Sequence, residues 1–411
     1  LKALGWTDNS TTATFSAITT AGMFLGALVG GIIGDKTGRR NAFILYEAIH
    51  IASMVVGAFS PNMDFLIACR FVMGVGLGAL LVTLFAGFTE YMPGRNRGTW
   101  SSRVSFIGNW SYPLCSLIAM GLTPLISAEW NWRVQLLIPA ILSLIVTALA
   151  WRYFPESPRW LESRGRYQEA EKVMRSIEEG VIRQTGKPLP PVVIADDGKA
   201  PQAVPYSALL TGVLLKRVIL GSCVLIAMNV VQYTLINWLP TIFMTQGINL
   251  KDSIVLNTMS MFGAPFGIFI AMLVMDKIPR KTMGVGLLIL IAVLGYIYSL
   301  QTSMLLITLI GFFLITFVYM YVCYASAVYV PEIWPTEAKL RGSGLANAVG
   351  RISGIAAPYA VAVLLSSYGV TGVFILLGAV SIIVAIAIAT IGIETKGVSV
   401  ESLSIDAVAN K

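Results

Sequence analysis

The chain has 411 residues, of which 56% are hydrophobic and only 12% are charged, and its formal net charge is +8. Soluble domains carry about 25% charged residues, so this composition excludes the soluble classes and indicates a polytopic membrane protein. The basic residues lie at the ends of apolar runs instead of forming one stripe, so we expect no nucleic-acid partner and read them as topology signals.

The numbers and spacing of cysteine and histidine residues argue against disulfide bonds and metal sites. The four cysteines are widely spaced within or beside apolar runs, and the sequence holds one histidine. This pattern fits neither a disulfide framework nor a metal site. The sequence also contains no phosphate-binding loop, nucleophile elbow or metal motif. We therefore expect no enzymatic activity, no cofactor and no metal.

Windowed hydrophobicity predicts eleven membrane spans. In chain order they lie near residues 12–34, 41–60, 65–90, 101–123, 134–154, 217–239, 253–275, 282–300, 304–330, 343–366 and 372–392.

The loops between these spans alternate in charge. The first loop holds Lys36, Arg39 and Arg40, and every second loop after it is again rich in bases. The positive-inside rule places these loops and the C-terminus in the cytoplasm, with residue 1 outside. Because the chain then starts outside with Leu1, we expect a first span to be missing from a natural set of twelve.

One segment between the fifth and sixth predicted spans is long and polar. Its stretch RYQEAEKVMRSIEEGV has apolar residues at helical spacing, which predicts an amphipathic helix, and a Pro- and Gly-rich linker follows. We therefore predict an N-terminal transmembrane half at 1–154, a cytoplasmic linker at 155–216 and a C-terminal transmembrane half at 217–411.

An internal repeat supports this division. The stretch from Asp35 to Arg40 recurs as Asp276 to Lys281, an offset of 241 residues. The motif EYMP followed by RG recurs as EIWP followed by RG, and ESPR recurs loosely as ETK, at nearly the same offset. Three motifs at one offset indicate two homologous six-span halves.

The stretches GGIIGDKTGRR, PESPRWL and PEIWPTEAKLRGSG resemble the major facilitator superfamily, in its sugar-porter and organic-ion-transporter branches. The resemblance covers essentially the whole chain. Within this group, the sequence is similar to bacterial inner-membrane metabolite transporters. It implies an all-α membrane fold of two six-helix halves, alternating access, a monomer in the lipid bilayer and a small-molecule substrate.

The resemblance also implies a charge latch at the cytoplasmic face. Asp35 would engage the facing half near Arg341, where free N–H groups of a helix start favour a carboxylate. Gly38 becomes Pro279 in the second repeat, so we expect the second loop to turn differently and to be the weaker element. The residues assigned to the latch are Asp35, Arg39, Arg40, Glu90, Arg97, Glu156, Arg159, Glu332, Arg341 and Glu394.

Polar groups at membrane depth give the candidate substrate site, because they are costly there and mark function. Arg351 is placed near the midplane, and its surroundings resemble a span in which organic-ion transporters carry an arginine for anionic substrates. Pairing with an internal acid or snorkelling is the structural alternative. The predicted substrate-binding residues are Arg351, Asn109, Tyr112, Asn229, Gln232, Tyr233, Tyr321 and Tyr324.

Glu47 and His50 are three residues apart on one predicted helix and could carry a coupling proton, although a packed polar pair is the alternative. The leading hypothesis is a proton-coupled symporter of a small organic anion, a carboxylate. A proton-coupled or facilitative sugar or polyol transporter is the second hypothesis, and a non-transporting nutrient sensor is the third.

Overall fold

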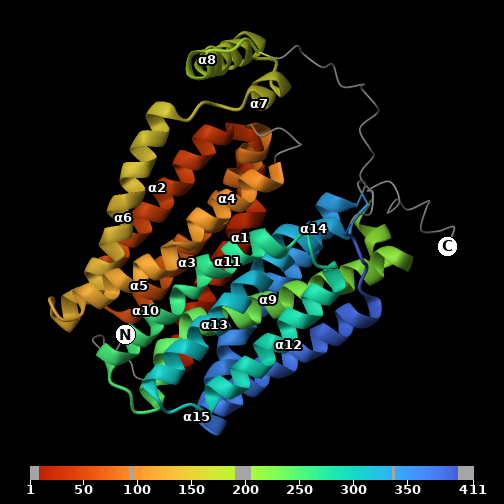
Figure 1. Ribbon diagram of the computed structural model, residues 1–411. Helices are drawn as coiled ribbons and strands as arrows, with labels where there is room; N and C mark the ends of the chain where they lie inside the picture. Colours follow the sequence, from red (N-terminus) through yellow and green to blue (C-terminus); the bar gives the residue numbers. More distant parts are fainter. Residues whose placement is uncertain (1–8, 92–96, 190–204, 336–337, 397–411) are drawn as a thin grey trace. The chain divides into compact units, whose positions relative to one another are not determined.

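The computed structural model describes residues 9–91, 97–189, 205–335 and 338–396, with side chains described outside 85–102 and 339–340. Within these ranges all regular structure is helical (Figure 1), which confirms the expected all-α class. Two compact units arise: unit 1 comprises residues 1–17, 98–131 and 201–411, and unit 2 comprises residues 18–97 and 132–200. The predicted division at 154 and 217 remains a prediction.

Unit 2 is built on close contact between two glycine-rich helices. A Cβ atom on Gly22 or Gly26 of α1 would overlap the backbone of α3, and a Cβ atom on Gly78 of α3 would overlap the backbone of α1. Small residues at four-residue spacing thus let the two backbones meet directly. Its helices are α1 (Asn9–Thr37, from residue 18 on), α2 (Arg39–Ala58), α3 (Met63–Tyr91), α6 (Ala128–Tyr153), α7 (Pro158–Ser163) and α8 (Tyr167–Thr185).

Unit 1 has its core around α9, and α15 packs along that helix at Gly350, which meets Leu225. Besides the first residues of α1, its elements are α4 (Arg97–Asn109), α5 (Ser111–Leu122), η3 (Tyr206–Leu210), α9 (Gly212–Thr245), α10 (Leu250–Met261), α11 (Gly263–Val274), α12 (Arg280–Ser299), α13 (Met304–Val322), the π-helical η4 (Cys323–Tyr329), α14 (Val330–Glu332) and α15 (Lys339–Ile391).

The described residues contain nine helical stretches long and apolar enough to cross a membrane. One of them, α15, covers the last two predicted spans, which meet at Gly369 with a non-helical φ of 65° and ψ of −161°. The predicted span at 101–123 is divided into α4 and α5, which end and begin on either side of Trp110. The eleven predicted spans are therefore all helical, and the difference lies in how the helices are divided.

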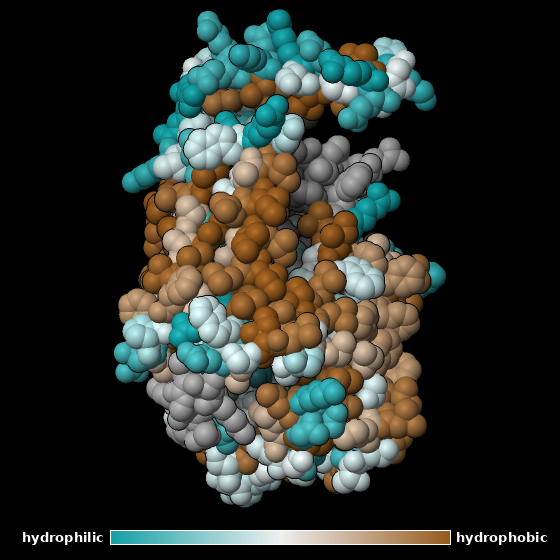
Figure 2. Space-filling view, turned by 90° about the vertical axis from the view of Figure 1, so that its left-hand side faces the viewer, coloured by the Kyte–Doolittle hydropathy of each residue, from teal (hydrophilic) through white to brown (hydrophobic). Residues whose placement is uncertain are grey.

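The predicted amphipathic helix is α8. Its stripe of Ala170, Val173 and Ile177 is turned inward, while Met174 and Val181 are exposed. Gly186 ends it in the left-handed conformation with φ 64°, a common helix stop. In Figure 2 the α8 end of unit 2 is hydrophilic and the helical surface beyond it is hydrophobic, as expected where spans face lipid.

Candidate functional site

A glutamate caps the start of α2 in unit 2. Oε1 of Glu156 accepts hydrogen bonds from the backbone nitrogens of Arg39 at 2.6 Å and Arg40 at 3.3 Å. A carboxylate at a helix N-terminus satisfies otherwise free N–H groups and interacts favourably with the helix dipole. Gly38 forms the one-residue turn between α1 and α2 with φ 95°, and a Cβ atom there would overlap the Glu156 carboxylate.

Asp35 holds the other side of this cluster. Its carboxylate pairs with the Arg39 guanidinium at 2.7 Å, and its side chain is 71% exposed. Its backbone oxygen accepts bonds from Trp160 Nε1 at 2.8 Å and from an Arg164 guanidinium nitrogen at 2.7 Å, which fastens α7 to the end of α1. The Arg40 guanidinium donates to the backbone oxygen of Trp151 on α6.

The second repeat in unit 1 is built in the same way. The Glu394 carboxylate accepts the backbone N–H of Arg280 at 2.8 Å and of Lys281 at 3.1 Å. The backbone N–H of Lys396 also donates to this carboxylate, at 3.1 Å. Burial opposes ionisation of Glu394, but these three N–H donors outweigh it and lower its pKa.

Arg280 is the centre of the second cluster and is buried. Its Nε and Nη2 atoms donate to the two oxygens of Glu332 at 3.0 and 3.2 Å, and Nη2 also meets Asp276 at 3.2 Å. Thr395 donates to Glu332 at 2.6 Å. The loop does turn differently here, since Pro279 has φ −57°. The relative strength of the two latch elements remains a prediction.

Two further predicted latch residues, Arg159 and Arg341, have described side chains. Arg159 is exposed, and the Arg341 guanidinium lies 5.2 Å from the centre of the Tyr206 ring, a cation–π contact that ties η3 to the start of α15. The side chains of Glu90 and Arg97 lie outside the described part of the chain.

Arg351 stands on α15, ten residues or about 15 Å along the helix from Arg341. Its side chain is half-buried, and within the described ranges its guanidinium makes no hydrogen bond or ion pair. The preceding Gly350 packs against α9, where a Cβ atom would lie 3.0 Å from Nδ2 of Asn229. Arg351 therefore lies next to the contact between α9 and α15.

A polar cluster lies between α5, α9 and α13 of unit 1. The Tyr112 and Tyr319 rings meet edge to face with centroids 5.1 Å apart, and Gln232 borders both hydroxyl groups, with Tyr233 beside Tyr112. The Tyr319 hydroxyl is buried without a hydrogen bond. Three predicted residues, Tyr112, Gln232 and Tyr233, are thus brought together.

The sequence reasoning missed two members of this region, Tyr319 and Asn257. Nδ2 of Asn257 on α10 donates to Ser116 on α5 at 3.2 Å, and its Oδ1 is buried without a partner. An amide in the first part of a predicted apolar span was the available signal for Asn257. Tyr319 carried no such signal, because tyrosines on both faces of α13 look alike in sequence.

Four of the predicted substrate residues have protein contacts of their own. Asn109 and Asn229 donate to backbone oxygens one turn back on their own helices, at 2.7 Å each. Tyr321 is buried and donates to the Val224 backbone at 3.1 Å, and Tyr324 stacks on Tyr329 at 5.0 Å. The two tyrosines thus belong to the packed core of unit 1.

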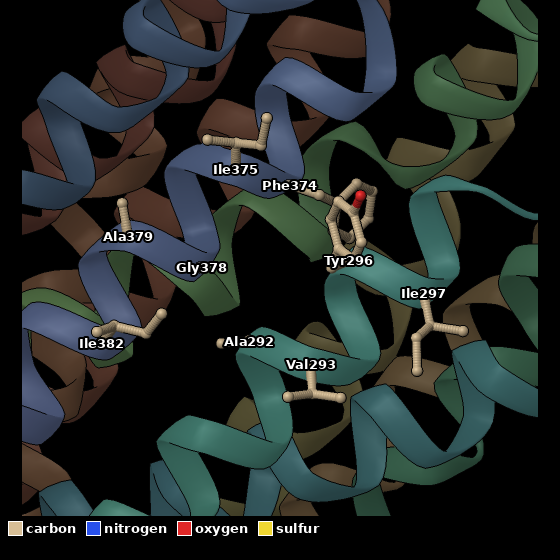
Figure 3. Close-up of a pocket in the computed structure, with 9 residues that line it drawn as sticks. All are labelled: Ala292, Val293, Tyr296, Ile297, Phe374, Ile375, Gly378, Ala379 and Ile382. Carbon is tan, nitrogen blue, oxygen red and sulfur yellow. The ribbon is translucent and has the colours of Figure 1, made fainter.

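A cavity of about 440 Å³ lies between α12 and α15 (Figure 3). Its walls are almost wholly apolar, and several of its side chains, such as Val293, Tyr296 and Ile375, are also exposed. Such a groove suits a hydrocarbon chain and offers no group for a polar metabolite. It is separate from the predicted substrate residues. The lining residues are Ala292, Val293, Tyr296, Ile297, Phe374, Ile375, Gly378, Ala379 and Ile382.

Comparison with known proteins agrees with these features. The chain is 44% identical to the inner membrane metabolite transport protein YdjE of Escherichia coli K12, over 97% of this chain and 88% of that protein. It is 27% identical to the niacin transporter NiaP of Acinetobacter baylyi, over 93% of this chain and 85% of that one.

Among solved structures, the xylose transporter XylE from E. coli, in a partially occluded inward-open conformation, matches with a TM-score of 0.75 at 18% identity, over 95% of this chain and 89% of that one. Another structure of XylE, described as a major facilitator superfamily proton:xylose symporter, has a TM-score of 0.66 at 21% identity. These likenesses establish the fold.

The family model of the sugar (and other) transporters matches residues 3–407, nearly the whole chain. A match of this length, on a chain whose described residues form nine membrane-length helices, identifies a multi-pass membrane protein whose activity is transport and not an enzymatic reaction. The chain belongs to the sugar (and other) transporter family and is a secondary transporter of the major facilitator superfamily fold.

Proposed function

We propose that the protein is a proton-coupled symporter of a small organic anion, with Arg351 as the group that recognises a substrate carboxylate. A guanidinium stays charged at membrane depth and requires an anion or several acceptors. Arg351 makes no hydrogen bond or ion pair within the described part of the chain, which leaves its donors available. This single observation carries the proposal.

The neighbouring residues supply the rest of the site in this proposal. Tyr112, Gln232 and Tyr233 offer hydroxyl and amide groups on helices of the same unit, and Asn229 lies beside Gly350, the residue before Arg351. The relative NiaP transports niacin, a small aromatic carboxylate. The location we propose is the bacterial inner membrane, as the name of YdjE states for that protein.

Alternating access also requires interactions that form in one conformation of the transporter and break in the other. We assign this role to the charge clusters around Glu156 and Glu394, with Asp35, whose exposed carboxylate is paired with Arg39, as the group that engages a second surface in the other state. Such a network biases an equilibrium between states separated by a few kcal/mol even when single pairs contribute about 0–1 kcal/mol.

A sugar or polyol is the second candidate substrate class. The buried Tyr319 hydroxyl and the Asn257 Oδ1 atom lack partners, and both suit a polyhydroxylated ligand. The xylose transporter XylE shares the fold. A nutrient sensor is the third candidate, and counterflow in proteoliposomes separates it from both transporters because a sensor exchanges nothing.

The decisive test compares an acid with its amide. Purified protein is assayed for binding of nicotinate and nicotinamide by thermal shift, and for counterflow of nicotinate in proteoliposomes. We expect the wild type to prefer the acid, Arg351→Lys to weaken acid binding by about tenfold, and Arg351→Ala to abolish it. Lysine cannot reproduce the two parallel bonds of an arginine–carboxylate pair.

Ser353→Ala is the matched control, because its hydroxyl bonds only to the backbone oxygen of Gly350 on the same helix, at 2.6 Å. It should bind nicotinate as the wild type does. If acid and amide bind the wild type equally, Arg351 is structural and the anion proposal fails. Binding of pentoses instead would favour the second candidate.

A further inference from the structure

An acid and an imidazole are buried together on α2. Oε2 of Glu47 lies 3.7 Å from Nδ1 of His50, one turn along the helix. The side chains are 9% and 12% exposed, and neither of these two atoms makes a hydrogen bond. Buried polar atoms without partners are uncommon and call for an explanation.

The pair lies at the centre of a membrane span. α2 begins at Arg39, so Glu47 and His50 are eight and eleven residues, or about 12 and 16 Å, along it. The hydrocarbon core of a bilayer is about 30 Å thick, which places both groups near its middle.

The helices around the pair are packed closely. A Cβ atom on Gly76 of α3 would lie 3.1 Å from the backbone nitrogen of His50, and the Tyr46 hydroxyl donates to the backbone oxygen of Gly30 in α1 at 2.8 Å. On the α6 side, Met54 of α2 packs with Ala140. Tyr46, the titratable residue next to Glu47 in the chain, is thus already bonded to α1.

No other charged group faces the pair from these helices in the described part of the chain. α1 has none before Asp35 near its end, and α6 has none between Arg133 and Arg152. α3 has none for the nineteen residues after Arg70, which lies beside Cys69 at the level of Gly57. About two turns separate that level from His50, roughly 10 Å along α2.

The charge of such an isolated pair depends on its proton count. With no proton, Glu47 is a carboxylate beside a neutral imidazole, and the pair carries a net negative charge. With one proton, the pair is neutral overall, whichever residue holds it. An uncompensated charge in hydrocarbon is strongly unfavourable, so closed packing around the pair favours the protonated form.

We propose that Glu47 and His50 together form the proton-binding site of the transporter, and that a proton enters the pair from water on one side of the membrane and leaves to water on the other. The pair is closed when it holds the proton, and it must be hydrated to release it. Proton occupancy and conformation are thereby linked. The proposal rests on the transport activity proposed above.

The single histidine makes the pair directly observable, because protein labelled with ring-¹⁵N-histidine gives the signal of a single imidazole, from its Nδ1 and Nε2 atoms. We expect the pH dependence of this signal to report both residues, so Glu47→Gln changes the proton affinity of His50 at least tenfold. Ser53→Ala is the control, since its hydroxyl bonds only to the Ile49 oxygen of the same helix at 2.6 Å. Identical titrations of wild type and Glu47→Gln would overturn the proposal.

Transport supplies the second readout, with nicotinate as probe in proteoliposomes. One proton per substrate lets a difference of one pH unit drive about tenfold accumulation. Glu47→Gln and His50→Gln should keep counterflow but lose this accumulation, and gradient-driven accumulation by either variant would contradict the proposal. If the wild type exchanges no nicotinate, the proposed substrate class fails, while the imidazole titration still decides the role of the pair.

Discussion

Glu156 holds the start of α2, with its Oε1 atom 2.6 Å from the backbone nitrogen of Arg39. The carboxylate can approach so closely because the residue between α1 and α2 has no side chain. Gly38 combines a φ of 95° with direct contact to Glu156, so both its backbone conformation and the space around it require glycine.

Gly38→Ala should therefore lower stability by about 1–3 kcal/mol, from a backbone conformation unfavourable to alanine and displacement of the Glu156 cap. The melting temperature of the purified protein measures the effect. Gly286→Ala is the control, because it lies inside α12 with nothing within 4 Å of a new Cβ atom, and it should be neutral or stabilising. Equal melting temperatures for the two variants would refute the cap.

Arg280→Lys should be more damaging than the same change on the surface. Arg280 binds both oxygens of Glu332, and its side chain is only 7% exposed. Lysine cannot form this pair of bonds, and we expect a loss of about 1–3 kcal/mol. Arg175→Lys on α8, where both partners of the Arg175–Glu171 pair are exposed, should change stability by less than about 0.5 kcal/mol. Chemical denaturation of the two variants compares them, and similar midpoints would count against the buried pair.

The stability of the second cluster should depend on pH through Glu394. Its folded-state pKa lies below the ordinary value of 4.5, so its stabilising contribution is present above that value and is lost as the pH falls through the lowered one. Wild-type melting temperatures should thus fall on acidification below about pH 4.5. Glu394→Gln should lose part of this dependence and Glu171→Gln, an exposed carboxylate on α8, should keep it. An unchanged profile in Glu394→Gln would exclude the capping role.

Orientation in the membrane can be tested with single cysteines placed in a variant lacking the four natural ones. Thr37→Cys and Lys187→Cys should react with an impermeant maleimide only from the cytoplasm, and Gly247→Cys only from outside. All three positions are exposed, so accessibility reports the side of the membrane and not burial. Labelling of Thr37→Cys from outside would reverse the assignment from loop charges.

Much of this fold was predictable because spans are a matter of length and hydropathy, as α2, α6 and α12 illustrate. The repeat also predicted the likeness of the two charge clusters. Local breaks were not predictable: the division at Trp110 and the turn at Gly369 depend on backbone angles that a hydropathy window averages away. Helix boundaries were imprecise for the same reason: the first span was predicted to end near residue 34, whereas α1 continues through Asp35 to Thr37.

The candidate site was predictable only in part. Arg351 was predicted because charge is rare at membrane depth, and its role stays a prediction. Tyr112, Gln232 and Tyr233 were predicted from polar faces, and the structure brings these three together. The same logic assigned Tyr321 and Tyr324, whose side chains are fully buried in unit 1. Hydropathy cannot distinguish a tyrosine that packs against a neighbouring backbone from one that borders a polar cluster, because both are amphipathic.

The two glutamate caps also impose an order on biosynthesis. Glu156 follows Arg39 by 117 residues, and Glu394 follows Arg280 by 114. At ribosomal speeds of about 5–20 residues per second, the first turn of α2 waits roughly 6–23 s before its cap is made. During that interval its free N–H groups must be met by water or lipid headgroups, so the start of α2, like that of α12, gains its cap only after the polar segment that carries the glutamate has left the ribosome.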